Sequence, residues 1–117
     1  MSLLISYSKT FPISVSLEEK LNTALSYIFN EEGIIDGSIN LKILTDEDMK
    51  ELNKKFRNKN TATNVLSFSN EDISKSVTGN LGDIAISYEF VKRESKELKT
   101  NFDDHMIHML IHGVYHI

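Results

Sequence analysis

The hydrophobic residues of this chain switch repeatedly between a two-residue and a 3.6-residue spacing, and this switching limits the folds open to it. Two-residue alternation predicts strands near residues 3–7, 39–43, 64–68 and 82–86, while helical spacing fills most of the remaining chain. The predicted order is β-α-β-α-β-β-α-α, and its first βαβ unit should cross over in the right-handed sense. The sequence therefore predicts an α+β (α/β-like) fold in which helices pack on a mixed four-stranded sheet.

Polar residues that accept hydrogen bonds from a first helical turn mark the start of each predicted helix. The first helix begins with a capping box at residues 16–19, Ser-Leu-Glu-Glu, and the second has an apolar stripe of Met49, Leu52 and Phe56. Residues 69–81 are polar and are predicted to form a loose hairpin. The caps expected for the second, third and fourth helices are Thr45, Ser87 and Asn101.

The length and composition suit one small domain that works in a reducing compartment. We expect a single domain over residues 1–117, because no linker or repeat divides the chain. The absence of cysteine suits a reducing compartment. No apolar run reaches the roughly 20 residues of a membrane span, so a cytoplasmic location is predicted. The 13 Lys and Arg residues against 17 Asp and Glu residues give a net charge of −4, which excludes a basic coat over the whole surface.

All four histidines fall in the last predicted helix, which makes it the most informative segment for function. At 100° per residue, His105, His108, His112 and His116 fall within an arc of about 80°. Apolar residues cover most of the rest of the circumference, so we expect a buried helix whose imidazoles face one site. Each buried imidazole would then need a partner, since an unsatisfied polar group costs about 1–3 kcal/mol.

The last helix is predicted to be a metal-site helix at the C-terminus. His112 and His116 lie one turn apart, the separation at which two imidazoles can bind one tetrahedral metal ion. For His108, contact with the substrate or with a metal ligand is as plausible as plain packing. Gly113 stands where a peptidase motif of the His-Glu-x-x-His type has its glutamate, so peptidase chemistry loses support. A glycine in mid-helix also suggests that another backbone or a substrate approaches closely there.

A local basic segment contrasts with the acidic chain around it. Residues 50–59 carry five basic side chains and one acidic one, a local charge of +4. Arg57 ends the predicted helix, and its planar guanidinium can hold a phosphate through two parallel hydrogen bonds. A solvated helix face is the alternative interpretation for the lysines. The candidates for anion binding are Lys54, Lys55 and Lys59, with hydroxyls nearby on Thr61, Thr63 and Ser67.

Three segments together resemble the YbeY family of bacterial metal-dependent endoribonucleases, which act in ribosomal RNA maturation and ribosome quality control. The first runs from Leu-Asn-Lys-Lys-Phe-Arg at 52–57 to Thr-Asn-Val-Leu-Ser-Phe at 63–68. The second is Leu-Gly-Asp-Ile-Ala-Ile-Ser at 81–87, and the third is the His-Gly-Val-Tyr-His run at 112–116. Their order and spacing cover about residues 35–117, and the combination is specific although each piece alone is weak.

The resemblance implies roles for individual residues. His112 and His116 would be zinc ligands, with one Zn²⁺ per intact chain, and Arg57 would engage RNA phosphate or stabilise charge during cleavage. Lys54, Lys55 and Lys59 would contact RNA. The family's third histidine would fall at position 122, beyond Ile117, so we expect a YbeY-like domain that lacks its C-terminal end and binds metal weakly. Asn64 replaces the family's usual aspartate.

The function implied is a zinc-dependent, single-strand-specific endoribonuclease that matures the 3′ end of 16S ribosomal RNA. Its partners would be ribosomal RNA and the ribosome, with no membrane or DNA partner. Asp83 could orient a partner or simply begin a strand. Two alternatives stay open: a ribosome-binding or RNA-binding module with a structural metal, and a metal hydrolase of another small substrate.

Overall fold

The computed structural model describes residues 2–69 and 80–117 and contains one mixed sheet. The strand order is β1-β2-β4-β3, with β1 parallel to β2, β2 parallel to β4, and β3 antiparallel to β4. The prediction of a mixed four-stranded sheet is confirmed, while residues 70–79 of the predicted hairpin lie outside the described residues. The strands are β1 (Ser2–Tyr7), β2 (Ser38–Leu44), β3 (Val65–Ser69) and β4 (Asn80–Ser87).

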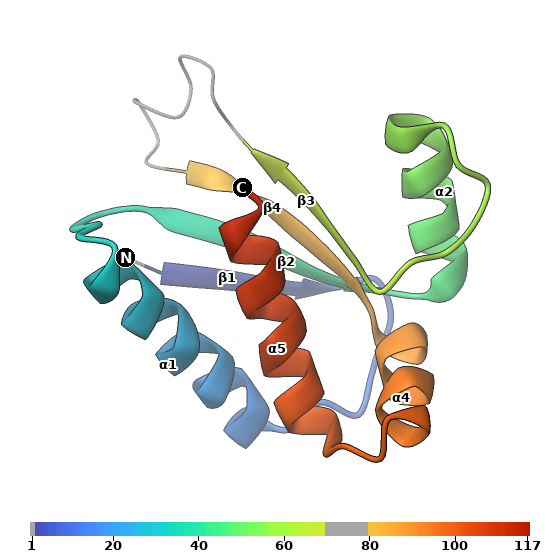
Figure 1. The fold of residues 1–117 in the computed structure, drawn as a ribbon, viewed down its shortest axis with the longest axis horizontal. Coiled ribbons are helices and arrows are strands. Elements are labelled where there is room, and N and C mark those ends of the chain that lie inside the picture. Colours follow the sequence, from blue (N-terminus) through green and yellow to red (C-terminus); the bar gives the residue numbers. More distant parts are fainter. Residues whose placement is uncertain (1, 70–79) are drawn as a thin grey trace.

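The helices lie on both faces of this sheet (Figure 1). Helices α1 and α5 lie side by side on one face, α2 covers part of the other face, and α4 contacts the first half of α5. The described elements follow the predicted order. In the described parts of the chain, no helix has the length and apolar content needed to cross a membrane. The helices are α1 (Val15–Glu31), α2 (Asp46–Arg57), α4 (Tyr88–Glu97) and α5 (Phe102–Tyr115).

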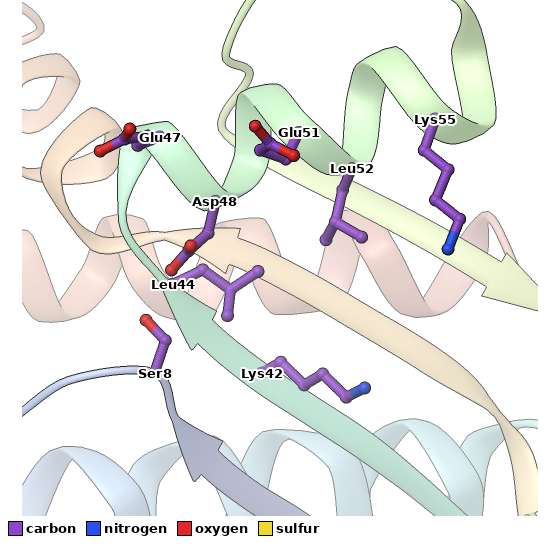
Figure 2. Close-up of a pocket in the computed structure, with 8 residues that line it drawn as sticks. All are labelled: Ser8, Lys42, Leu44, Glu47, Asp48, Glu51, Leu52 and Lys55. Atoms are coloured by element: carbon purple, nitrogen blue, oxygen red, sulfur yellow. The ribbon is translucent and has the colours of Figure 1, made fainter.

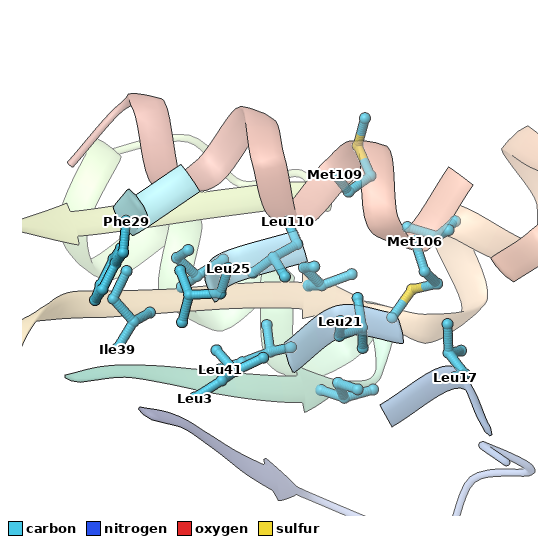
Figure 3. Close-up of a cluster of buried hydrophobic side chains, with 14 residues drawn as sticks. Leu3, Leu17, Leu21, Leu25, Phe29, Ile39, Leu41, Met106, Met109 and Leu110 are labelled. Atoms are coloured by element: carbon cyan, nitrogen blue, oxygen red, sulfur yellow. The ribbon is translucent and has the colours of Figure 1, made fainter. Parts of the chain in front are cut away.

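The alternation of side chains along each strand supplies apolar groups to both faces. On β4, Ile84 and Ile86 join the main core with α1 and α5, whereas Ala85 joins Met49 and Leu66 beneath α2. Neighbouring residues of one strand therefore serve two separate layers. Figure 3 shows this main core, with Leu21 and Leu25 of α1 close to Leu110 of α5. The main core consists of Leu3, Leu17, Leu21, Leu25, Phe29, Ile39, Leu41, Ile43, Ile84, Ile86, Val91, Met106, Met109 and Leu110.

The helix caps agree with the predictions at three positions and differ at one. Thr45, Ser87 and Asn101 each accept a backbone hydrogen bond from the first turn of their helix. The first helix is capped instead by Ser14, whose Oγ accepts from the Leu17 N–H at 3.0 Å. The prediction of a cap at Ser16 was wrong, because the helix already begins at Val15 and Ser16 lies within its first turn.

Candidate functional site

The end of α5 brings two imidazoles together at the protein surface. His112 and His116 have ring centroids 4.4 Å apart, and their ring planes are inclined by 44°. Both side chains are exposed, so a cation and a substrate can reach them. Two imidazoles at this separation on one helix can bind one metal ion.

Gly113, between these histidines, allows α5 to lie very close to the sheet. A Cβ atom at this position would lie 3.0 Å from Ile84 Cγ2 and 3.2 Å from Ser67 Oγ. Ser67 uses this proximity to donate a hydrogen bond from Oγ to the Gly113 carbonyl oxygen at 2.8 Å. The mid-helix glycine does mark a close approach, but the approaching groups are two side chains of the sheet and not the backbone or substrate that was expected.

Ser67 also connects α5 to Arg57, the last residue of α2. The Arg57 guanidinium donates from Nη2 to the Ser67 carbonyl oxygen at 3.3 Å. Because β3 is an edge strand, its backbone is accessible from the side where α2 ends. The structure thus links Arg57, through one residue, to the turn of α5 that carries His112 and His116.

A buried asparagine holds the end of α2 in place. Asn53 is only 5% exposed, and its Nδ2 donates to the Thr61 carbonyl oxygen at 2.9 Å. The Lys59 N–H donates to the Asn53 carbonyl oxygen at 3.2 Å, and Asn58 between them takes the left-handed conformation with φ 55°. These bonds close the helix immediately after Arg57. Sequence reasoning missed the role of Asn53 because nothing in the run of polar residues around it indicates that its side chain is buried.

The first half of the histidine stripe has different surroundings. Of the four histidines only His105 is buried, and its Nε2 lies 2.7 Å from Glu94 Oε1 on α4. His108 lies beside His105, with ring centroids 6.0 Å apart. The expectation of four buried imidazoles facing one site was therefore wrong. The stripe faces α4 only in its first half, and the second half of α5 extends beyond α4 to the surface (Figure 1).

Asn64 takes part in the same contact. Its Nδ2 donates to Glu94 Oε1 at 3.1 Å, so Glu94 accepts from both the amide and His105. An aspartate at this position has no N–H to donate and would place a second carboxylate beside the first. The replacement of the family's usual aspartate is therefore compatible with this local structure.

The Glu94 contact predicts a pH dependence of stability. Partial burial by itself would raise the pKa of the Glu94 carboxyl, but hydrogen bonds from His105 and Asn64 outweigh it and hold that pKa below 4.5. Such a carboxylate stabilises the fold above its unfolded pKa, and the stabilisation is lost as the pH falls through the folded pKa. We therefore expect the free energy of unfolding to decrease as the pH falls below about 4.5. This decrease should be larger for the wild type than for Glu94→Gln, which has no carboxylate to protonate at this position.

Urea unfolding at a series of pH values measures this difference. Glu19→Gln, which changes an exposed carboxylate on α1, should follow the wild type. Parallel curves for the wild type and Glu94→Gln would contradict the assignment.

The remaining predicted residues are dispersed around this site. Lys54, Lys55 and Lys59 are exposed, and Lys55 extends toward the space between α2 and β2. Asp83 lies on the α2 face of the sheet, where it accepts a hydrogen bond from Asn40 Nδ2 at 2.9 Å. The three lysines therefore lie on or just after the last turn of α2, which also carries Arg57. Asp83 lies on the face of the sheet opposite α5.

The donor set at the end of α5 is suited to zinc but does not complete a site. Imidazole nitrogens are common zinc ligands, and a structural or catalytic zinc site uses at least three protein ligands. Within residues 2–69 and 80–117, no three His, Asp or Glu side chains gather as a metal-binding group. His112 and His116 therefore account for two ligands of a zinc site.

Comparison with known proteins identifies the family. A family model described as Endoribonuclease YbeY matches residues 5–117. The chain belongs to the YbeY family. The YbeY resemblance found in the sequence motifs is thereby confirmed.

Curated relatives and a solved structure agree with this assignment. Proteins named Endoribonuclease YbeY from Francisella philomiragia and Chelativorans are 32% and 38% identical over 104 and 88 residues, covering 86% and 74% of this chain. The alignments cover 66% and 54% of those relatives, so this chain spans between about half and two thirds of their length. The solution structure of TM1509 from Thermotoga maritima matches with a TM-score of 0.66 and 26% identity, covering 96% of this chain and 69% of that one.

Proposed function

We propose that the chain supplies two zinc ligands and the Arg57 site of a zinc-dependent, single-strand-specific endoribonuclease that acts in the maturation of ribosomal RNA, including the 3′ end of the 16S molecule. Membership of the YbeY family and relatives named as endoribonucleases support this proposal. Ribosomal RNA and the ribosome are its proposed partners, with a role in ribosome quality control, and the cytoplasm is its proposed location.

The observation that carries the proposal is the short connection between the imidazole pair and Arg57. Ser67 accepts a hydrogen bond from Arg57 and donates one to Gly113, which lies between His112 and His116. Arg57 and Gly113 thus both contact Ser67 on edge strand β3, so a phosphodiester that crosses this edge could meet the guanidinium as well as the imidazoles. Zinc held by His112 and His116 would supply Lewis-acid chemistry toward that phosphodiester.

The residues of the chain then have distinct tasks. Arg57 can hold two phosphate oxygens and balance the negative charge that these oxygens carry in the transition state of cleavage. Ser67 and Gly113 keep α2 and α5 in register across the edge of the sheet. The lysines on the last turns of α2 add positive potential that attracts the RNA backbone.

The test is a His116→Ala variant assayed for zinc and for RNA cleavage. We expect it to lose zinc occupancy and cleavage of single-stranded RNA together, since one ligand of the pair is removed. His108→Ala removes an exposed imidazole that lies beside His105, so it should retain the zinc occupancy of the wild type. Unchanged zinc occupancy in His116→Ala would contradict ligation.

The same assays separate the alternatives. A binding module with a structural metal would bind RNA without cleaving it, whatever the metal content. A hydrolase of a small phosphate or amide would cleave that substrate and be indifferent to RNA.

A further inference from the structure

A cavity on the opposite face of the sheet is lined by aromatic, aliphatic and charged side chains. It occupies about 380 Å³ between α2 and the strands, within the range typical of small-molecule pockets. Leu52 and Phe56 of α2 form one wall, while Phe68 and Ala85 of the sheet lie across from them. The cavity is therefore lined mainly by apolar side chains, two of them aromatic.

Its aromatic residues are accessible to a ligand. Phe56 is 54% exposed, and its ring centroid lies 5.2 Å from that of Phe68 with the planes inclined by 62°. The sequence pattern had placed Phe56 in the apolar stripe of α2, but the structure leaves half of it in contact with solvent. Exposed aromatic rings are the surfaces on which single-stranded nucleic acids stack their bases.

The charges around the cavity favour an anionic ligand at one end. The Lys42 and Lys55 side chains line it, and the Lys55 ammonium nitrogen lies 5.3 Å from the Phe56 ring centroid. Figure 2 shows the adjoining space along α2, in which these two lysines lie toward one end and Glu47 and Asp48 toward the other. A phosphate would be attracted to the end with the lysines. This end lies beside the last turn of α2, which also carries Arg57.

The cavity also has a hydrogen-bond acceptor suited to the polar edge of a base. Asp83 lines it and accepts a hydrogen bond from Asn40 through one of its two carboxylate oxygens. A carboxylate can accept further hydrogen bonds from amino or imino groups of a base. Apolar walls, two lysines and one acceptor together match a base with its attached phosphate.

We propose that this cavity binds one nucleotide of single-stranded RNA, with the base against Phe56 and Phe68 and the phosphate beside Lys42 and Lys55. The inference rests on the proposed function and adds a position for the substrate. Phe68 and Ser67 are consecutive residues of edge strand β3, so their side chains lie on opposite faces of the sheet. A strand bound in the cavity could cross this edge past Arg57 to reach the imidazole pair.

The experiment measures binding of a labelled oligouridine to the chain by fluorescence anisotropy, with EDTA present so that no cleavage occurs. A second probe has the same sugar-phosphate backbone without bases. We expect Phe56→Ala to weaken oligouridine binding by about fivefold or more and to leave binding of the abasic probe unchanged. Lys42→Ala should weaken both probes and reduce the dependence of affinity on salt.

Matched variants make these results specific. Tyr27→Ala removes a 66% exposed aromatic from α1, and Lys50→Ala removes an exposed lysine from α2 outside the cavity, so both should bind like the wild type. Phe56→Leu keeps apolar bulk for folding but lacks a flat ring, and should bind like Phe56→Ala.

Three outcomes would overturn the base site. The first is that Phe56→Ala binds oligouridine as tightly as Tyr27→Ala does. The second is that Phe56→Ala loses affinity equally for oligouridine and for the abasic probe. The third is that the wild type does not bind oligouridine. Zinc-dependent cleavage is assayed separately, so the cavity can fail while the proposed activity stands.

Discussion

Replacing Arg57 with alanine is expected to lower the proposed zinc-dependent RNA cleavage by about two to three orders of magnitude. A preorganised donor that faces developing charge stabilises the transition state more than the bound substrate, so its removal affects the rate most. The stability of the fold should hardly change. The side chain is exposed, and its bond to the Ser67 carbonyl oxygen is 3.3 Å long, so its loss should cost about 1 kcal/mol or less.

Single-turnover cleavage of a labelled single-stranded RNA measures this effect, and urea unfolding checks the fold. Arg57→Lys keeps the charge but lacks the planar fork, so it should restore only a part of the lost rate. Lys50→Ala changes an exposed charge elsewhere on α2 and should cleave like the wild type. Unchanged cleavage by Arg57→Ala would remove this residue from the mechanism.

Replacing Gly82 with alanine is expected to destabilise the fold by about 3 kcal/mol, near the upper end of the range for overpacking. A Cβ atom here would lie 2.5 Å from the Phe68 carbonyl oxygen and 3.2 Å from two atoms of the Ile117 side chain. The first neighbour is backbone of the paired strand and cannot rotate away. Gly82 also adjoins an irregularity in the register between β2 and β4, where a glycine commonly allows close approach.

Gly33→Ala is the matched control for the effect of steric contact. Gly33 has φ 69°, which disfavours alanine, but nothing lies within 4 Å of the added Cβ. The expected loss is about 1–2 kcal/mol, from the backbone conformation alone. Urea unfolding of both variants compares the two losses, and a Gly82→Ala loss no greater than that of Gly33→Ala would contradict the predicted clash.

Much of the fold follows from signals that are local in the chain. Strand and helix spacing placed all eight described elements in the correct order, and the caps at Thr45, Ser87 and Asn101 were correct because each bond spans only two or three residues. The cap of α1 was misplaced by two residues, since Ser16 has the Glu19 that a capping box requires, whereas the observed cap, Ser14, is followed at that position by Leu17. Local signals locate an element well and its boundary less well.

The candidate site divides in the same way. The spacing of His112 and His116 on one helix was sufficient to predict that their rings lie together. The histidine stripe did not reveal that His105 would instead contact Glu94, because this depends on how α4 packs against α5. Asn53 and Phe56 show the same limit, since the polar residue is buried and the aromatic one is half exposed. The exposure of each depends on the elements that pack against it, which the local sequence does not specify.

The order of helices and strands, the YbeY motifs and the pairing of two imidazoles on one helical turn could all be predicted from the chain alone. These features depend on residues a few positions apart, whose geometry the regular backbone repeat sets. The packing of the elements was needed to show that Ser67 connects Arg57 to Gly113, which lies 46 positions from Ser67 in the chain. It was also needed to show that a cavity lies between α2 and the sheet. Such contacts arise when separate elements pack together, and no local spacing specifies them.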